Sequence, residues 1–237
     1  MLYLIGLGLN VDGISAYGLE IVKRCKRVYL DNYTVDFPYS VEELGEFIGK
    51  KIIRADRELL ESLSLVDEAQ KMDVALLVYG SPLTATTHIS LIQEAKRTRV
   101  RYKVIYNASI LDAVAETGLQ LYKFGKIASV PKWQENFTPD SFMKTIQENI
   151  SIKAHSLILC DIGLDFQDAL KQLSQAARNY KISLKKIIVC QCLGTKHRRI
   201  VYRELKNLEE EDFKKPYCII IPSKLHFMEL EVLKEFS

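Results

Sequence analysis

The feature that most constrains the fold is an alternation of short apolar runs with amphipathic stretches along the whole chain. The run "DVALLVYG" (Asp73–Gly80) is almost continuously apolar, which is typical of a parallel strand covered on both faces. The stretches Ile14–Lys26, Glu58–Lys71 and Ile110–Gly118 are predicted as helices, and the last of them ends at its glycine. Strands that alternate with helices favour βαβ units and a parallel sheet. The pattern therefore predicts an α/β protein.

The second half of the chain alternates less regularly than the first. Its strands are expected over Ser156–Ile162, Lys186–Leu193 and Tyr217–Pro222, because each range holds a short run of branched apolar residues. The segment "LYKFGK" (Leu121–Lys126) separates the two halves. The sequence therefore predicts two domains, over residues 1–122 and 123–237.

The composition argues against several classes of function. The chain has 237 residues and a formal net charge of +3, which is too small to demand nucleic acid as a partner. None of the five cysteines forms the C-x-x-C pair of a zinc or redox site. The sequence shows no signal-peptide pattern, so we expect reduced thiols in a cytoplasmic protein. No apolar run has the length of a membrane span, and the four histidines are too scattered to predict a metal site. We therefore expect no metal, no membrane association and no direct contact with nucleic acid.

The chain begins with a Gly-x-Gly turn directly after an apolar run, "MLYLIGLGLN". A dinucleotide fingerprint requires a third glycine three positions after the second, where this chain has Val11. An acidic residue, Asp31, does end the next strand region, where such folds read a ribose hydroxyl. The pattern leaves open both a dinucleotide site and a tight turn that holds no phosphate.

Two later strand ends carry hydroxyl side chains beside a helix start. In "YGSPLTATTH" (Tyr79–His88), four hydroxyls follow a Gly-Ser-Pro turn, and one of them suffices for a helix N-cap. In "NASILDAV" (Asn107–Val114), Ser109 and Asp112 have the spacing of a capping box. Helix starts at the carboxyl edge of a parallel sheet are where ligands bind in open α/β folds.

Taken in order, these segments resemble the diphthine synthase branch of the tetrapyrrole-methylase-like methyltransferases. The combination of "ATTH", "NASI" and "LYKFG" is more similar to this branch than to the porphyrin-modifying members, and more similar to eukaryotic than to archaeal forms. The resemblance covers essentially the whole chain. Its segments are Tyr3–Leu9, Lys26–Thr34, Gly80–His88, Asn107–Val114, Gly118–Lys126 and Lys224–Leu233.

The resemblance implies a fold, a cofactor and a substrate. The fold is two α/β domains, a parallel sheet in the first and a mixed sheet in the second, with S-adenosylmethionine in the cleft between them. Members act as homodimers. The substrate is translation elongation factor 2, whose modified histidine is methylated on the route to diphthamide, and S-adenosylhomocysteine is the product. Eukaryotic-type members methylate both the amino group and a carboxylate of the modified side chain.

The resemblance also implies eight contacts to the cofactor. They fall at the ends of strands in both predicted domains, and each position also suits a residue of the core or a helix cap. The eight residues are Leu9, Ser81, Thr84, Ser109, Ile110, Cys160, Leu193 and Tyr217.

The chain departs from the family pattern at Ser81, where members usually carry an aspartate. A serine hydroxyl still donates and accepts a hydrogen bond, so the position remains suitable for binding. No catalytic base is identified: His88 and Tyr122 lie in matched segments, and neither is assigned. A carboxylate nucleophile needs no base, whereas an amine must first lose a proton.

Three alternatives remain beside the main hypothesis. A tetrapyrrole methyltransferase would share the fold and the cofactor. A nicotinamide-dependent oxidoreductase is disfavoured by Val11 at the third fingerprint position. A protein that binds the elongation factor without methylating it is suggested only by the loss of the carboxylate at Ser81.

Overall fold

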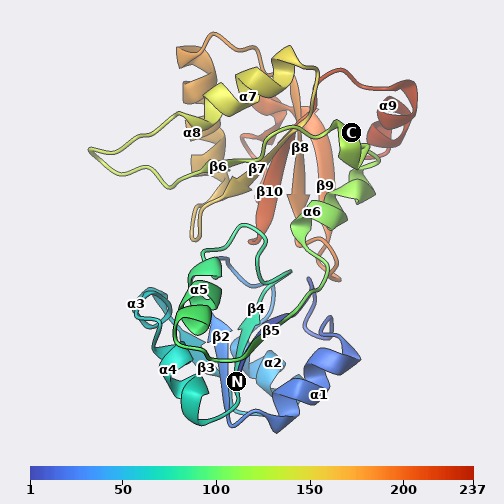
Figure 1. Ribbon diagram of the computed structural model, residues 1–237. Helices are drawn as coiled ribbons and strands as arrows, with labels where there is room; N and C mark the ends of the chain where they lie inside the picture. The colour runs from blue at the N-terminus through green and yellow to red at the C-terminus, as the bar shows by residue number, and fades with distance from the viewer. The chain divides into compact units, whose positions relative to one another are not determined.

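The computed structural model describes all residues from Met1 to Ser237. The chain forms two compact units, Met1–Leu111 and Asp112–Ser237, and each contains a five-stranded sheet. Figure 1 shows both units as α/β structures, as the sequence predicts. The boundary expected from the sequence, between residues 122 and 123, lies inside the second unit.

The sheet of the first unit is entirely parallel, with the strand order β3-β2-β4-β1-β5. Because all its strands run in one direction, their carboxyl ends meet at a single edge of the sheet. The segments that follow these ends are therefore neighbours in space although they are far apart in the sequence. The strands are β1 (Leu2–Gly6), β2 (Arg27–Asp31), β3 (Ile53–Ala55), β4 (Val74–Val78) and β5 (Tyr102–Ile105).

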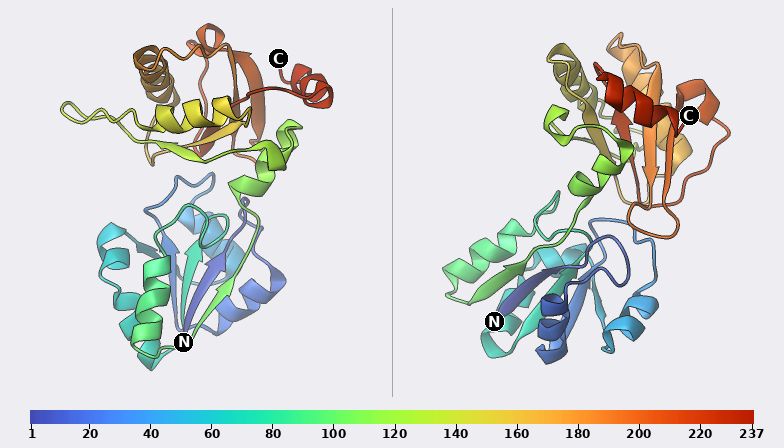
Figure 2. Two further views of the ribbon diagram at one scale, coloured as in Figure 1. Left: turned by 45° about the horizontal axis from the view of Figure 1, so that its top comes forward. Right: turned by 90° about the vertical axis from the view of Figure 1, so that its right-hand side faces the viewer.

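Helices cover both faces of this sheet (Figures 1 and 2). The helices α1 (Ala16–Arg24) and α2 (Val41–Ile48) pack on one face. The helices α3 (Arg57–Glu61), α4 (Ser64–Lys71) and α5 (Ile89–Arg97) pack on the other. Burial on both faces explains why the central strand β4 is apolar at every position.

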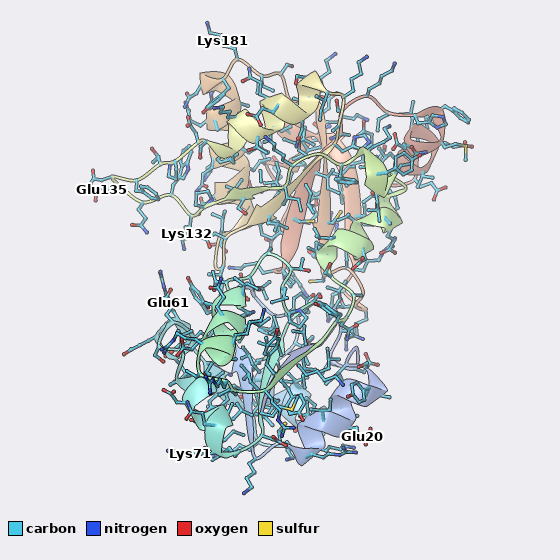
Figure 3. All side chains as sticks on the ribbon, viewed as in Figure 1. Glu20, Glu61, Lys71, Lys132, Glu135 and Lys181 are labelled. Atoms are coloured by element: carbon cyan, nitrogen blue, oxygen red, sulfur yellow. The ribbon has the colours of Figure 1, made fainter.

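Charged side chains lie on the outward faces of these helices. Figure 3 shows Glu20, Glu61 and Lys71 at the periphery of the first unit, on α1, α3 and α4. The apolar stripes of the same helices face the sheet, which is the arrangement that their amphipathic sequences predict.

Two predicted helices differ from those in the structure. The range Glu58–Lys71 is two helices, because Leu63 has a left-handed φ of 59° and interrupts the backbone between α3 and α4. The range Ile110–Gly118 is a single α-helical turn, α6 (Ile110–Ala113), followed by the 3-10 helix η1 (Val114–Thr117). Gly118, with φ of 79°, ends η1 as expected for a C-terminal glycine.

The sheet of the second unit is mixed, with the order β6-β7-β10-β8-β9. Only β6 and β7 pair in parallel, whereas β10 is antiparallel to both of its neighbours. The sequence prediction missed β9, whose three buried residues sit between charged ones and which pairs with β8 over its full length. The strands are β6 (Ala128–Val130), β7 (Ser156–Cys160), β8 (Lys186–Gln191), β9 (Arg199–Glu204) and β10 (Tyr217–Ile221).

The helices α7 (Phe142–Ser151) and α8 (Phe166–Asn179) share the main core cluster of this unit with one face of its sheet. The helix α9 (Phe227–Lys234) packs against η1, where a Cβ at Gly118 would lie 2.5 Å from Val232. The short helices η2 (Leu121–Lys123) and η3 (Leu205–Leu208) complete the unit. The segment between β6 and α7 projects outward with Glu135 at its tip (Figure 3).

Candidate functional site

In the first unit, the segments after β1 and β4 are joined to each other at the carboxyl edge of the sheet. The amide of Gly8 donates to the carbonyl of Gly80 over 3.1 Å, and the amide of Gly80 donates back to the carbonyl of Gly8 over 2.9 Å. Both glycines have left-handed backbone, with φ of 70° and 72°. A side chain would strain the backbone at either position, so this joint requires glycine on both strands.

The segment after β5 is attached to the same place by one side chain, that of Asn107. Its Nδ2 donates to the carbonyls of Gly6 and Gly13 over 3.0 and 2.9 Å, and its Oδ1 accepts from the amide of Ala108 over 2.8 Å. A Cβ at Gly6 would lie 2.7 Å from the carbonyl oxygen of Gly80 and 2.8 Å from the Cβ of Asn107. Gly6 therefore allows the three segments to approach one another.

Five of the eight predicted contact residues lie at this edge. Leu9, Ser81 and Ser109 are buried there, and Thr84 and Ile110 are half-buried. One further bond, 3.2 Å long, holds the segment of Leu9: the Tyr79 hydroxyl donates to the Leu9 carbonyl. A Cβ at Gly80 would lie 3.6 Å from the Cα of Ser109, so Ser81 and Ser109 stand on touching segments.

The other three predicted residues lie at one edge of the second sheet. The pairing of Cys218 with Leu159 in the antiparallel ladder makes Tyr217 and Cys160 cross-strand neighbours. Tyr217 pairs on its other side with Gln191, the last residue of β8, and Leu193 follows two positions later. The structure therefore brings Cys160, Leu193 and Tyr217 to one edge of this sheet.

The side chains of Cys160 and Tyr217 at this second edge are neutral near pH 7. Burial raises the pKa of the Cys160 thiol to about 12. Burial and the neighbouring Cys160 raise the pKa of Tyr217, whose hydroxyl donates to the Leu164 carbonyl over 3.0 Å. A thiol with so high a pKa is a poor nucleophile, so these positions suit contact with a ligand better than chemistry.

The two side chains that the sequence left unassigned as bases have different environments. Tyr122 is 82% exposed, on η2. His88 is buried, with its Nε2 atom 3.2 Å from Oδ2 of Asp31 and its Nδ1 atom 3.0 Å from the Pro82 carbonyl. The sequence could not reveal this pair, although Asp31 ends β2 and His88 lies in the segment after the neighbouring strand β4.

The structure holds neither a cluster of metal-binding side chains nor a membrane-spanning helix. No group of three or more His, Cys, Asp or Glu side chains is arranged to hold a metal ion. None of the helices combines the length and the apolar character that crossing a membrane requires. All five cysteines are free thiols.

The sequence matches a family model and curated relatives over most or all of its length. Residues 1–209 match the model of the Tetrapyrrole (Corrin/Porphyrin) Methylases. The diphthine methyl ester synthase of Candida glabrata is 37% identical, over 100% of this chain and 90% of the relative. The human diphthine methyl ester synthase is 36% identical, over 100% of this chain and 95% of the relative.

A solved structure is also similar to this chain along its whole length. A crystal structure of diphthine synthase matches with a TM-score of 0.90 and 35% sequence identity, and the match covers 100% of this chain and 95% of that one. The likeness thus extends through both units, including the mixed sheet of the second.

Proposed function

Because the chain belongs to the diphthine methyl ester synthases within the tetrapyrrole (corrin/porphyrin) methylase family, we propose that it methylates the modified histidine of translation elongation factor 2. It is an S-adenosylmethionine-dependent methyltransferase, as the members of this family are. The observation that carries the proposal is the match to these synthases over the entire chain and nearly the whole length of the relatives.

The first unit has the chemistry that such a cofactor needs. The three joined segments offer backbone groups, the hydroxyls of Ser81, Thr84 and Ser109, and the apolar side chains of Leu9 and Ile110. These groups suit a cofactor that carries no phosphate and is held by hydrogen bonds and apolar contacts. We assign them, with Cys160, Leu193 and Tyr217, as its contacts.

S-adenosylmethionine supplies a methyl group on a sulfonium, which is already a strong electrophile. The task left to the protein is to hold the donor and the acceptor in line, and alignment alone contributes a large rate advantage. An acceptor carboxylate can react in its ionised form, whereas an acceptor amine must first release its proton to a base or to solvent. The buried His88 has its Nδ1 bonded to the Pro82 carbonyl and its Nε2 turned to Asp31, and we do not assign it as that base.

The proposal also covers the product, the absence of a metal, the cellular compartment and the oligomeric state. The product is S-adenosylhomocysteine, no metal takes part, and the protein works in the cytoplasm as a homodimer. Free thiols at all five cysteines suit a reducing compartment. Sedimentation velocity tests the homodimer directly, because a monomer at micromolar concentration would contradict it.

The function is tested by binding and then by mass. The pure protein is titrated by calorimetry with S-adenosylmethionine and with NADH. It is then mixed with S-adenosylmethionine and with elongation factor 2 that carries the unmethylated intermediate. We expect binding of S-adenosylmethionine alone, and a mass increase of the factor equal to a whole number of methyl transfers.

Each other outcome has a distinct meaning. Binding of NADH without S-adenosylmethionine would contradict the proposal at the level of the cofactor. Binding of S-adenosylmethionine with no change in the mass of the factor would instead favour a tetrapyrrole substrate or a protein that only binds the factor.

A further inference from the structure

One buried pair of ionisable side chains, Asp31 and His88, lies beside the proposed cofactor segment and has no part in the function described so far. Asp31 is the last residue of β2, and His88 immediately precedes α5. Their side chains are 0% and 2% exposed, and Oδ2 of Asp31 lies 3.2 Å from Nε2 of His88. Fifty-six residues of chain separate them, so only the adjacency of β2 and β4 brings them together.

The His88 ring lies between two oxygen atoms from different segments. Nδ1 lies 3.0 Å from the Pro82 carbonyl, which can only accept, so Nδ1 carries the proton of this bond. Nε2 lies 3.2 Å from Oδ2 of Asp31 but makes no well-aligned hydrogen bond.

Asp31 is held as the ionised partner. Its Oδ1 accepts from the amides of Tyr33 and Thr34 over 2.9 and 3.2 Å, and its Oδ2 accepts from the Thr34 hydroxyl. Burial raises the pKa of Asp31, but the adjacent His88 side chain and the hydrogen bonds from Thr34 and Tyr33 outweigh burial and bring the pKa below its usual value. The negative end of the pair is thus fixed to β2.

His88 is attached to the cofactor segment through a single carbonyl, that of Pro82. The Pro82 oxygen accepts from Nδ1 of His88 and also from the Thr86 hydroxyl, over 2.8 Å. Within the same segment the amide of Thr84 donates to the Ser81 carbonyl over 3.1 Å. Gly80 anchors the beginning of this segment to Gly8, and His88 anchors its end to β2.

We propose that His88 is a positioning residue whose bond through Nδ1 fixes the Pro82 carbonyl and with it the contacts of Ser81 and Thr84 to S-adenosylmethionine. The inference rests on the proposed function, because it takes these two residues as cofactor contacts. Removing the bond to Pro82 weakens binding of the cofactor, whereas removing the attraction to Asp31 weakens the fold.

Two substitutions separate these effects. In His88→Asn, the amide nitrogen takes the place of Nδ1 and keeps the bond to Pro82, but the side chain does not reach Asp31. In His88→Gln, the amide nitrogen takes the place of Nε2 and keeps the contact with Asp31, but the bond to Pro82 is lost. Binding of S-adenosylhomocysteine is measured by calorimetry, and stability by thermal unfolding.

We expect the two variants to rank in opposite order by affinity for S-adenosylhomocysteine and by Tm. His88→Gln raises the Kd for S-adenosylhomocysteine about 10-fold, because it loses the buried hydrogen bond to the Pro82 carbonyl. His88→Asn leaves the Kd within about 3-fold of the unsubstituted protein, yet it has the lower Tm of the two because the buried carboxylate of Asp31 then loses the donor that His88→Gln keeps. A purely structural role would rank affinity and Tm in the same order, which would overturn the inference.

His155→Gln is the matched control. His155 is also buried and also lies near a carboxylate, 3.3 Å from Oε1 of Glu229, but it belongs to the second unit. We expect a lower Tm and an unchanged Kd. An equal loss of affinity in this control would show that destabilisation alone weakens binding, and the inference would fail.

Thr86→Val keeps the test decisive if a His88 variant does not fold. It removes the other donor to the Pro82 carbonyl and leaves the contact of His88 with Asp31 intact. We expect the Kd to rise about 3-fold with little change in Tm. An unchanged Kd would contradict the inference.

Failure of the proposed function and failure of this inference give different results. If the unsubstituted protein does not bind S-adenosylhomocysteine, the proposed function fails. If it binds and all variants bind equally, only the role of His88 fails.

Discussion

At the scale of single residues, the Gly-x-Gly turn allows the segments that follow β4 and β5 to pack closely against the end of β1. Gly6 lies where the backbone of Gly80 and the side chain of Asn107 leave no room for a Cβ. Gly8 takes a left-handed conformation and exchanges two hydrogen bonds with Gly80. The third position of a dinucleotide fingerprint, Val11, packs against the apolar core under α1 and α2. The turn thus joins segments and does not match a pyrophosphate cradle.

Gly6→Ala tests this role. The added methyl overlaps the Gly80 carbonyl and Asn107, so we expect a loss of about 1–3 kcal/mol in the free energy of unfolding. The three segments must also separate, so binding of S-adenosylmethionine should weaken. Gly45→Ala is the control, because its Cβ would meet only the Lys50 carbonyl at 3.3 Å, inside α2. Equal stability and affinity in both variants would contradict this role of Gly6.

At the scale of elements, the family segments "LYKFG" and "KLHFMELEVL" meet around one buried carboxylate. Oε1 of Glu229, on α9, accepts from the Gln120 amide over 3.1 Å and lies 3.3 Å from Nε2 of His155. Its Oε2 accepts from the His226 amide over 2.7 Å and from the ammonium of Lys123. These segments therefore hold the second unit together.

The protonation of this network follows from its bonds. The Ser223 amide donates to Nδ1 of His155 over 2.9 Å, so the single proton of a neutral ring sits on Nε2 and points to Glu229. Burial lowers the pKa of His155, which favours this neutral form. Burial raises the pKa of Glu229, but its hydrogen bonds to His226, Lys123 and Gln120 bring it to about 2.

Glu229 makes stability depend on pH. Its pKa falls from 4.5 in the unfolded chain to about 2 in the folded one, so it stabilises the fold above pH 4.5 and this contribution is lost as the pH falls toward 2. At about 1.4 kcal/mol for each unit of pKa, the contribution is on the order of 3 kcal/mol. Glu229→Gln should be less stable near pH 7 by about that amount and should lose much of the dependence below pH 4.5.

The fluorescence of Trp133, the only tryptophan, reports urea unfolding of the second unit at each pH. Glu231→Gln, on the exposed side of the same helix, should change stability by less than about 0.5 kcal/mol. If Glu229→Gln keeps the full acid dependence of the unsubstituted protein, another group is responsible.

At the scale of the whole molecule, the predicted contacts to the cofactor are divided between the two units. A ligand that contacts both units must stabilise the folded state of both units. At about 100 times its Kd, S-adenosylhomocysteine should add about 2.7 kcal/mol to the stability of the state that binds it. Hydrogen exchange should therefore slow in Gly80–His88 of the first unit and in Cys160–Leu164 of the second. NADH at the same concentration is the control and should change neither segment.

Protection confined to the first unit would contradict the assignment of Cys160, Leu193 and Tyr217. Protection of both segments by NADH would instead point to a dinucleotide and away from the proposed cofactor. Each result concerns amides near named residues, so the measurement separates the two sets of contacts.

The sequence alone determined the α/β class, most of the strands and the segments at their ends, because apolar periodicity and turn residues act locally. Only the tertiary structure decided that Asp31 meets His88 and that Glu229 gathers Gln120, Lys123 and His155. These contacts depend on the order of strands and on burial, which no local pattern contains. The strand β9 was missed for the same reason, since pairing with β8 stabilises it more than its own short apolar run does.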